Sequence, residues 1–534
     1  MNYADLFRVT LPETALELAA FVVLVADLVF LRRAALKTRM IAAALIGVVG
    51  CGAALWALQF QGRGGLSWGV GGEFTLLATG GFAQVAQSGI LVLTALTLLF
   101  LIDAEFTRHV GEFVAVVLMA AAGGLLVAAA EDLLVIFVGL ELLSLGLYIL
   151  TAFAKNSAKS AEAALKYYLF GGMSAAFLLF GFSYFYGLSG STNLQQIQRV
   201  IALSGPSPLF YVAWILVVAG LGFKVAAVPF HLWAPDTYEG APAPAAAFIA
   251  SVSKVASFAL LITLSLNWLR PGGSFSGEER LLEGVYRAWQ PLAATLLFAA
   301  AASMLAGNLA ALAQTSVRRL LAYSAIAHAG YILLGIAVNP AYSGQGSALG
   351  FLASSTAPAQ RSAAAVLFYI LTYGLTTIGA FGAIAVVERA TGSDRLDVFI
   401  GLHRRNPVLA AVLLVLFLSL AGIPPLVGFW AKFNLFAAVL GASAGVVPFA
   451  LVALAVALSA VSLYYYLQVL KRVYVMPAIE ETPGKIEKIQ VHPVTLAVLV
   501  LIAAAVLLLG CFPTLLEGWI EGFAPNWAST SALC

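Results

Sequence analysis

Charged residues are scarce in this chain. Only 10% of its 534 residues are Asp, Glu, Lys or Arg, whereas a soluble domain carries about 25%. Hydrophobic residues make up 62%, and the mean hydropathy is +0.98. The net charge of +3 is too small and too dispersed for a nucleic-acid partner. The composition therefore predicts one integral membrane protein embedded in a lipid bilayer.

Cysteine is also rare, and its spacing excludes several kinds of site. Cys51, Cys511 and Cys534 are far apart, and no CxxC, HExxH or P-loop pattern occurs. No GxGxxG follows a strand-like run. We therefore expect no iron–sulfur cluster, structural zinc or nucleotide on this chain, and no metal or cofactor site.

Long apolar stretches are what the chain has instead. A spanning helix needs about 20 apolar residues. Fourteen segments qualify, at 14–31, 40–60, 78–102, 112–130, 132–153, 164–187, 208–230, 245–269, 290–311, 320–338, 363–387, 407–437, 446–470 and 492–513. The sequence predicts an all-α polytopic membrane protein, with residues 1–534 forming a single membrane domain.

The distribution of basic residues predicts the orientation. Seventeen of the 28 Lys and Arg residues fall in loops after odd-numbered helices, and seven fall on the opposite side. Cytoplasmic loops are enriched in Lys and Arg, so both termini should face outward. Arg32 and Arg33 follow the first apolar run rather than precede it, which is the reverse of a cleaved signal peptide. A bacterial plasma membrane fits this pattern, with a photosynthetic membrane as the alternative.

Helices seven and twelve are interrupted by Gly and Pro, and each holds one lysine. Helix seven contains GLGFKVAAVPFHLWAPDTYEGAPAPA from Gly220, and helix twelve contains SLAGIPPLVGFWAKF from Ser419. Pro229 and the pair Pro424–Pro425 each remove helical hydrogen bonds. Unpaired backbone in hydrocarbon is tolerated only where protein or a water-filled cavity satisfies it. Both helices should be discontinuous.

The two broken helices are five helices apart, which reverses direction across the membrane. We therefore predict an inverted pair of five-helix repeats, helices 4–8 (residues 112–269) and helices 9–13 (residues 290–470). Discontinuous helices at matching positions of two halves indicate a transport site. The alternative is that each proline only kinks a packing helix.

Lys224, Lys254 and Lys432 lie inside apolar stretches. A charged side chain at mid-membrane costs about 2.5–3.5 kcal/mol on insertion scales, and such residues mark ion or proton paths. Burial lowers the proton affinity of a lysine, which makes it a workable proton carrier. Glu141 lies mid-helix with Ser144 on its face. We expect Glu141 to pair with Lys224, the alternative being a purely structural salt bridge.

Other polar residues are assigned less specific roles. His231 and His328 are possible proton relays, or else histidines satisfied within the core. Lys166 is either a modulating partner or an interfacial anchor.

Four further polar features should lie near the membrane surfaces. We expect Asp27 to be interfacial. Asp236 and Glu239 should lie in the loop after the broken helix, either solvated or lining an exit. Tyr464–Tyr466 should join an aromatic belt.

These motifs resemble the antiporter-like membrane subunits of respiratory complex I. The stretch Leu221–Phe258 carries KVAxxPFHxWxPDxYEGAP and both of its lysines, and Gly307–Tyr331 and Leu420–Phe433 also match. The resemblance covers nearly the whole chain and is greatest to subunit N, the equivalent of mitochondrial subunit 2. Subunit M would have a glutamate in place of Lys432, and subunit L would continue into further helices. The pair Arg318–Arg319 replaces a common lysine–arginine pair, which keeps the charge.

The resemblance implies a proton-pumping subunit of NADH–quinone oxidoreductase (NDH-1), a translocase coupled to electron transfer from NADH to quinone. It implies that Glu141 pairs with Lys224, and that Lys254 connects toward Lys432 along a hydrated axis. FMN, the Fe–S clusters and the quinone site would belong to partner subunits. The expected partners are other complex I membrane subunits and lipid.

The mechanism expected from these residues has two rivals. Protons would be taken up near Lys224, pass Lys254 and the histidines, and leave by Lys432. The first rival is a subunit of a cation/proton antiporter or of a membrane-bound hydrogenase. The second is a structural scaffold that does not pump.

Overall fold

The structure is a computed structural model that describes residues 3–61, 66–70, 74–104, 106–269, 279–337, 357–442, 445–477 and 488–523. Cys534 lies outside this range. The helices in chain order are α1 (Tyr3–Val9), α2 (Leu11–Val25), the π-helical turn η1 (Ala26–Phe30), α3 (Leu36–Phe60), α4 (Gly81–Leu101), α5 (Val110–Ala129), α6 (Leu133–Thr151), α7 (Ala158–Ser189), α8 (Leu194–Ser204), α9 (Pro208–Val225), α10 (Trp233–Gly240), α11 (Ala243–Leu269), α12 (Glu279–Ala311), α13 (Val317–Ala337), α15 (Ala357–Thr391), the 3-10 turn η3 (Leu396–Phe399), α16 (Leu402–Arg405), α17 (Pro407–Ala421), α18 (Val427–Ala442), α19 (Val446–Tyr474), α20 (Pro493–Cys511) and α21 (Thr514–Glu521).

The all-α prediction is confirmed. Within the described residues, twelve helices are long and apolar enough to cross a membrane, and α17 and α18 are shorter apolar helices. Each of the fourteen predicted segments contains helix. Helices suit a bilayer because they satisfy their backbone groups internally. The short elements α1, α8 and α21 and the hairpin of β1 (Ser67–Val70) and β2 (Phe74–Ala78) were not predicted.

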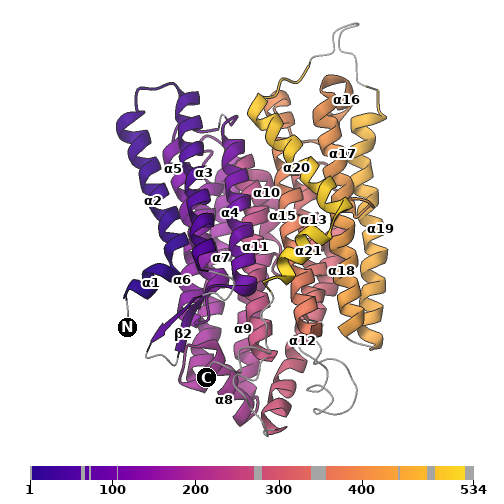
Figure 1. The fold of residues 1–534 in the computed structure, drawn as a ribbon. Helices are drawn as coiled ribbons and strands as arrows, with labels where there is room; N and C mark the ends of the chain where they lie inside the picture. Colours follow the sequence, from indigo (N-terminus) through magenta and orange to yellow (C-terminus); the bar gives the residue numbers. More distant parts are fainter. Residues whose placement is uncertain are drawn as a thin grey trace.

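The helices stand side by side, with α11, α13 and α15 between the N-terminal helices and the group α17 to α20 (Figure 1). Helix α11 contacts α4 and α15, and α15 contacts α18. The centre of the molecule is therefore closed off from lipid: all of the span-length window of α11 is buried, and nearly all of that of α13.

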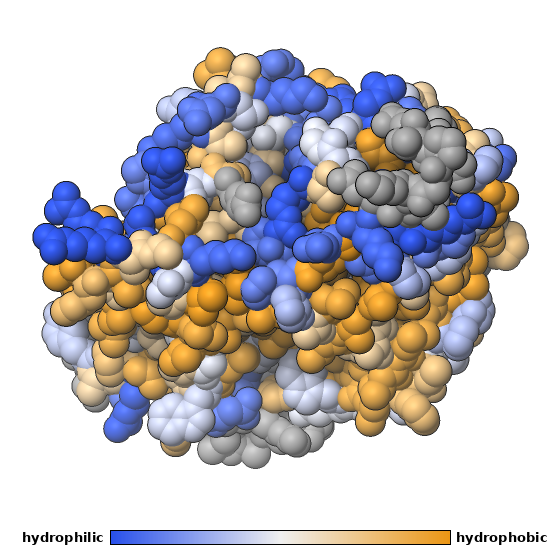
Figure 2. Space-filling model, turned by 90° about the horizontal axis from the view of Figure 1, so that it is seen from above, coloured by the Kyte–Doolittle hydropathy of each residue, from blue (hydrophilic) through white to orange (hydrophobic). Residues whose placement is uncertain are grey.

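The loops that follow the odd-numbered predicted segments lie on one side of the molecule, among them residues 312–316, 392–395 and 475–477. We call this side the basic face. Backbone hydrogen bonds join Val317 to Asp394 and Gly401 to Arg472 across these loops. Viewed from above, hydrophilic side chains gather across this face, beside a broad hydrophobic area (Figure 2). On the opposite side, Asp132 pairs with Asn193 in an isolated bridge. The alternation of loops agrees with the predicted topology.

Both predicted helix interruptions are present. One break lies between α9 and α10, and the other between α17 and α18. The boundaries of the two repeats stay a prediction, and residues 338–356 and 443–444 of the second lie outside the described residues.

Candidate functional site

The break after α9 is stabilised by side chains of neighbouring segments. Ala226 ends the helix in a left-handed conformation, with φ of 59°. The Val228 amide donates to Ser303 Oγ at 2.8 Å, and Trp233 Nε1 donates to the Phe223 carbonyl at 2.9 Å. Pro229, also in the break, has no amide hydrogen to donate. The backbone groups freed by the interruption thus find partners inside the protein.

Lys224 lies one residue before the end of α9 and is buried. Its Nζ donates to Ser144 Oγ at 2.5 Å and lies 3.8 Å from Glu141 Oε1. Glu141 and Ser144 are three residues apart on α6 and so share a face. The structure therefore brings together Glu141 and Lys224, which the sequence predicted to pair, and adds the Ser144 hydroxyl as a partner of Lys224.

Lys254, on α11, is held by backbone carbonyls rather than by a carboxylate. Its Nζ donates to the Val225 oxygen at 3.2 Å and to the Ala325 oxygen at 2.9 Å. Val225 is the last residue of α9, and a helix C-terminus carries partial negative charge. The broken helix thus supplies a favourable site for a cation on the neighbouring helix.

The break between α17 and α18 repeats this arrangement. Gly422 ends α17 in a left-handed conformation, with φ of 86°, and Pro424–Pro425 follow. Lys432 Nζ donates to the Ala421 oxygen at 2.9 Å and to Ser459 Oγ at 2.7 Å. Ala421 is the last residue of α17. Each break therefore presents its terminal carbonyl to a buried lysine.

Helix α13 connects the two lysine sites. The Ala325 carbonyl accepts from Lys254, and Lys432 Nζ lies 5.6 Å from the centre of the Tyr331 ring. His328 is three residues from each of these positions, and residues at that spacing share a helix face. Its Nδ1 is 2.7 Å from the Tyr369 hydroxyl. His328 is buried between the sites of Lys254 and Lys432.

The buried basic groups form one row, made of Lys224, Lys254, His328 and Lys432. A buried hydroxyl cluster that the sequence did not predict lies beside this row. Asn308 bonds the hydroxyls of Tyr331, at 3.1 Å, and Tyr465, at 3.3 Å, and Tyr466 bonds Ser324. The aromatic-belt prediction is wrong for Tyr465 and Tyr466, which are buried because they face the helices around α13. A polar Asn308 within an apolar span was the available signal.

Lys166 and His231 lie apart from the row. Lys166 Nζ pairs with Glu162 and with Asp236, each at 2.7 Å, and is 40% exposed. His231 lies in the α9–α10 break and is half-buried. Neither is bonded to a buried lysine in the described part of the chain.

The prediction of a loop for the acidic residues after the break is wrong. Asp236 and Glu239 belong to α10, between the predicted spans 208–230 and 245–269, and not to a loop. Arg319 on α13 pairs with both, at 2.7 and 2.9 Å. Burial raises the pKa of Glu239, but hydrogen bonds from Arg319 and Lys159 outweigh it and hold that pKa below its usual range.

Asp27 lies within the protein, and its interfacial depth stays a prediction. It is buried, and both of its carboxylate oxygens accept hydrogen bonds from Arg39. Asp27 Oδ2 also accepts from the Gly111 amide at 3.0 Å, which ties η1 to the start of α5. The sequence could not show this, because the partners come from two other helices.

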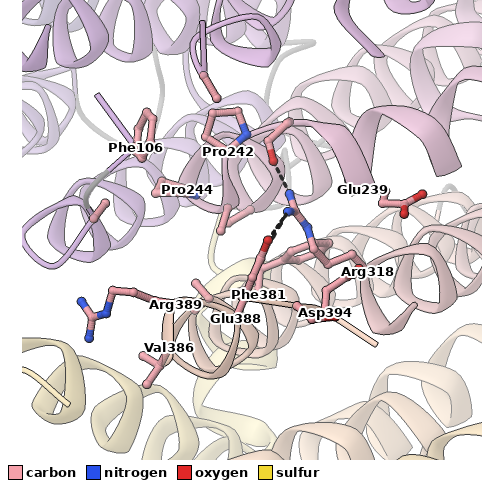
Figure 3. Close-up of a pocket in the computed structure, with 18 of the residues that line it drawn as sticks. Phe106, Glu239, Pro242, Pro244, Arg318, Phe381, Val386, Glu388, Arg389 and Asp394 are labelled. Carbon is pink, nitrogen blue, oxygen red and sulfur yellow. Dashed lines mark hydrogen bonds and ion pairs between the residues drawn. The ribbon is translucent and has the colours of Figure 1, made fainter. Parts of the chain in front are cut away.

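A cavity of about 740 Å³ opens at the basic face between the two halves. Charged side chains of both signs line it, including Arg318, Glu388 and Asp394 (Figure 3). Arg318 donates to the Ala241 carbonyl and pairs with Glu388 at 3.2 Å. These contacts join the start of α13 to α15 and to the end of α10.

Comparisons with known proteins agree with this architecture. The family model "NADH:quinone oxidoreductase/Mrp antiporter, TM" matches residues 130–356 and 341–459. NADH-quinone oxidoreductase subunit N 2 of Acidobacterium capsulatum is 46% identical over 532 residues, covering 98% of this chain and 99% of that protein. Subunit N 1 of Roseiflexus castenholzii is 39% identical, covering 89% of this chain and 85% of that protein.

Solved structures give the same result. A chain of respiratory complex I from Thermus thermophilus is 32% identical with a TM-score of 0.71, covering 95% of this chain and 98% of that one. A chain of the Mrp complex from Dietzia shares the fold at 22% identity and a TM-score of 0.73, covering 97% of this chain and 98% of that one. The chain therefore belongs to the NADH:quinone oxidoreductase/Mrp antiporter membrane family and is most similar to its subunit N members among these relatives.

Proposed function

We propose that this chain is the proton-translocating membrane subunit N of a bacterial NADH–quinone oxidoreductase, with no redox site of its own. The observation that carries the proposal is the row of buried basic groups, Lys224, Lys254, His328 and Lys432. The 46% identity to a subunit N over nearly the whole chain supports the choice of complex. FMN, Fe–S clusters and quinone belong to partner subunits in this proposal.

In the proposed mechanism, the row passes protons between neutral and charged states of its members. Glu141 stabilises the charged form of Lys224, because opposite charges 3.8 Å apart attract in a poorly screened interior. The carbonyls of Val225 and Ala421 stabilise the charged forms of Lys254 and Lys432. Electron transfer in the partner subunits alters the field at Glu141 and Lys224 and so starts each transfer.

Orientation and location complete the proposal. The basic face lies on the cytoplasmic side, because basic loops are retained there. Both termini then lie outside a bacterial inner membrane. Neighbouring membrane subunits of the same complex and lipid are the partners.

Replacing Lys224 with alanine in the assembled enzyme tests this function. We expect NADH-driven proton pumping by this subunit to be lost, while Lys155→Ala, which changes an exposed lysine, retains it. Undiminished pumping by Lys224→Ala would refute the central role of the row.

A cation/proton antiporter subunit is the second candidate, because the matching family model covers both kinds of protein. Purification of the native assembly with its companion chains separates the two. Redox subunits support the first function, and antiporter subunits alone support the second.

A further inference from the structure

We propose that the seam between α11 and α15 is the proton inlet of this subunit. In this proposal the hydroxyls of Thr377 and Tyr373 carry protons from the cavity at the basic face to His328. The inference rests on the proposed function and adds an uptake route that joins the row at His328 and Lys254 instead of at Lys224.

The cavity reaches far below the basic face along α15. Its lining includes Gly392 at the end nearest the loops and Phe381 at its floor. Eleven residues of helix separate these two positions, a rise of about 16 Å. The cavity therefore extends about three helical turns below the loops of the basic face.

Below the cavity floor, α15 continues with polar residues at four-residue spacing. Thr377, Tyr373 and Tyr369 follow Phe381 in this direction, and each is a neighbour of the one before it on the helix surface. The Tyr369 hydroxyl is 2.7 Å from His328 Nδ1, and the Tyr373 ring centre is 4.7 Å from that of His328. Two side chains, Thr377 and Tyr373, therefore separate the cavity floor from His328.

Helix α11 forms the opposite wall of the seam. Ala247 lines the cavity, and Lys254 lies seven residues further on, two turns down the same face. Ser251 lies between them and is buried. A Cβ atom built on Gly374 of α15 would lie 3.7 Å from Ser251 Cβ, so the two helices touch at this level. The seam ends at Lys254 on one wall and at His328 beside the other.

Polar atoms along this seam lack protein partners among the described residues. Tyr238 Oη and His328 Nε2 are buried and accept or donate no hydrogen bond there, and the Thr377 hydroxyl lies next to that of Tyr373. The Tyr238 ring lies 5.7 Å from the Phe381 ring at the cavity floor. Burying an unsatisfied hydroxyl costs about 1–3 kcal/mol, and ordered water usually satisfies such groups. In this proposal, water bound to these unpaired groups completes the chain of hydroxyls.

The transfer conserves protons at every step. Each hydroxyl or water oxygen accepts one proton and releases another, so it ends unchanged. The arriving proton is bound by the neutral imidazole of His328 at Nε2, which becomes imidazolium and then passes the proton toward Lys432.

Two neighbouring threonines of α15 provide a matched test. Thr377→Val removes the seam hydroxyl and keeps the shape, and Thr376→Val removes a hydroxyl that donates to the Thr372 carbonyl of its own helix at 2.8 Å. Both side chains are 2% exposed. In the whole enzyme in proteoliposomes, we expect Thr377→Val to lose the same share of NADH-driven acidification as Lys432→Met. Thr376→Val should pump normally, and Thr377→Ser should restore pumping.

Normal pumping by Thr377→Val beside a defective Lys432→Met would overturn the inlet and leave the proposed function intact. Normal pumping by both variants would overturn the proposed function itself. If Thr377→Val does not assemble, Tyr373→Phe decides, because it keeps the ring packed on His328. Loss of pumping in Tyr373→Phe supports the seam, and wild-type pumping rejects it.

Discussion

The two broken helices hold their lysines in different electrostatic surroundings. Lys224, at the first break, has a carboxylate 3.8 Å away and a hydroxyl partner. Lys432, at the second, is held by one carbonyl and the Ser459 hydroxyl, and no carboxylate of the described residues pairs with it. The carboxylate beside Lys224 controls the proton affinity of that lysine. Lys432 has only neutral partners, so it gives up its proton more easily. We infer that the first break controls the row and the second releases protons.

The largest effect is expected from Lys432→Met, which removes the release site and keeps the volume. All proton pumping by this subunit should stop, because neither the carbonyl of Ala421 nor the hydroxyl of Ser459 is basic enough to hold a proton as a stable cation in its place. The measurement is NADH-driven acidification of proteoliposomes. Lys471→Met, at an exposed lysine of α19, is the control and should pump normally.

Giving the second break a counter-charge should make it resemble the first. Ser459→Asp places a carboxylate beside Lys432, which then holds its proton more tightly. Each tenfold increase in the proton affinity of Lys432 slows proton release from it about tenfold. Pumping rates in the intact enzyme test this, with Ser459→Asn as the uncharged control. Equal rates for Asp and Asn would contradict the difference between the breaks.

Removing the counter-charge at the first break should have a smaller effect. Glu141→Gln keeps the shape of the side chain and leaves the bond from Lys224 to Ser144. We expect a partial, several-fold loss of pumping, because one partner remains. The double variant Glu141→Gln with Ser144→Ala should lose more than either change alone. A single variant that already matches Lys224→Ala would show that the hydroxyl contributes nothing.

The smallest effect concerns α10, the helix that follows the first break. Burial raises the pKa of Asp236, but hydrogen bonds from Lys166 and Arg319 outweigh it and hold that pKa below its usual range. The ionised carboxylate therefore stabilises the fold at neutral pH, and this contribution disappears as pH falls below about 4. Asp236→Asn should cost at most about 1 kcal/mol at pH 7, as expected for a partly exposed ion pair. Thermal unfolding of the purified enzyme at pH 7 and pH 3 measures the difference, which should shrink at the lower pH.

Local features of this site were predictable from sequence. Pro229 and Pro424–Pro425 interrupt helices by their own chemistry, and a lysine inside an apolar run demands a partner wherever it folds. The pairing of Lys224 with Glu141 also followed from one carboxylate on a polar face and from the family resemblance.

Long-range partners were not predictable from sequence. Carbonyls of Val225 and Ala325 hold Lys254, and any residue supplies a carbonyl, so no side-chain pattern marks them. Tyr466 looked interfacial because of its place near a helix end, yet it faces α13 and is buried. The partners of Lys254 and the burial of Tyr466 were missed for the same reason. The rotation of a helix about its axis depends on its packing against distant helices.

In the proposed mechanism, the buried basic groups form one hydrated row. The most direct measurement is an experimental structure of the active, assembled enzyme at a resolution that locates ordered water. We expect water molecules to bridge Lys224, Lys254, His328 and Lys432 in sequence. Apolar side chains filling the space between those groups, with no ordered water joining them, would contradict it.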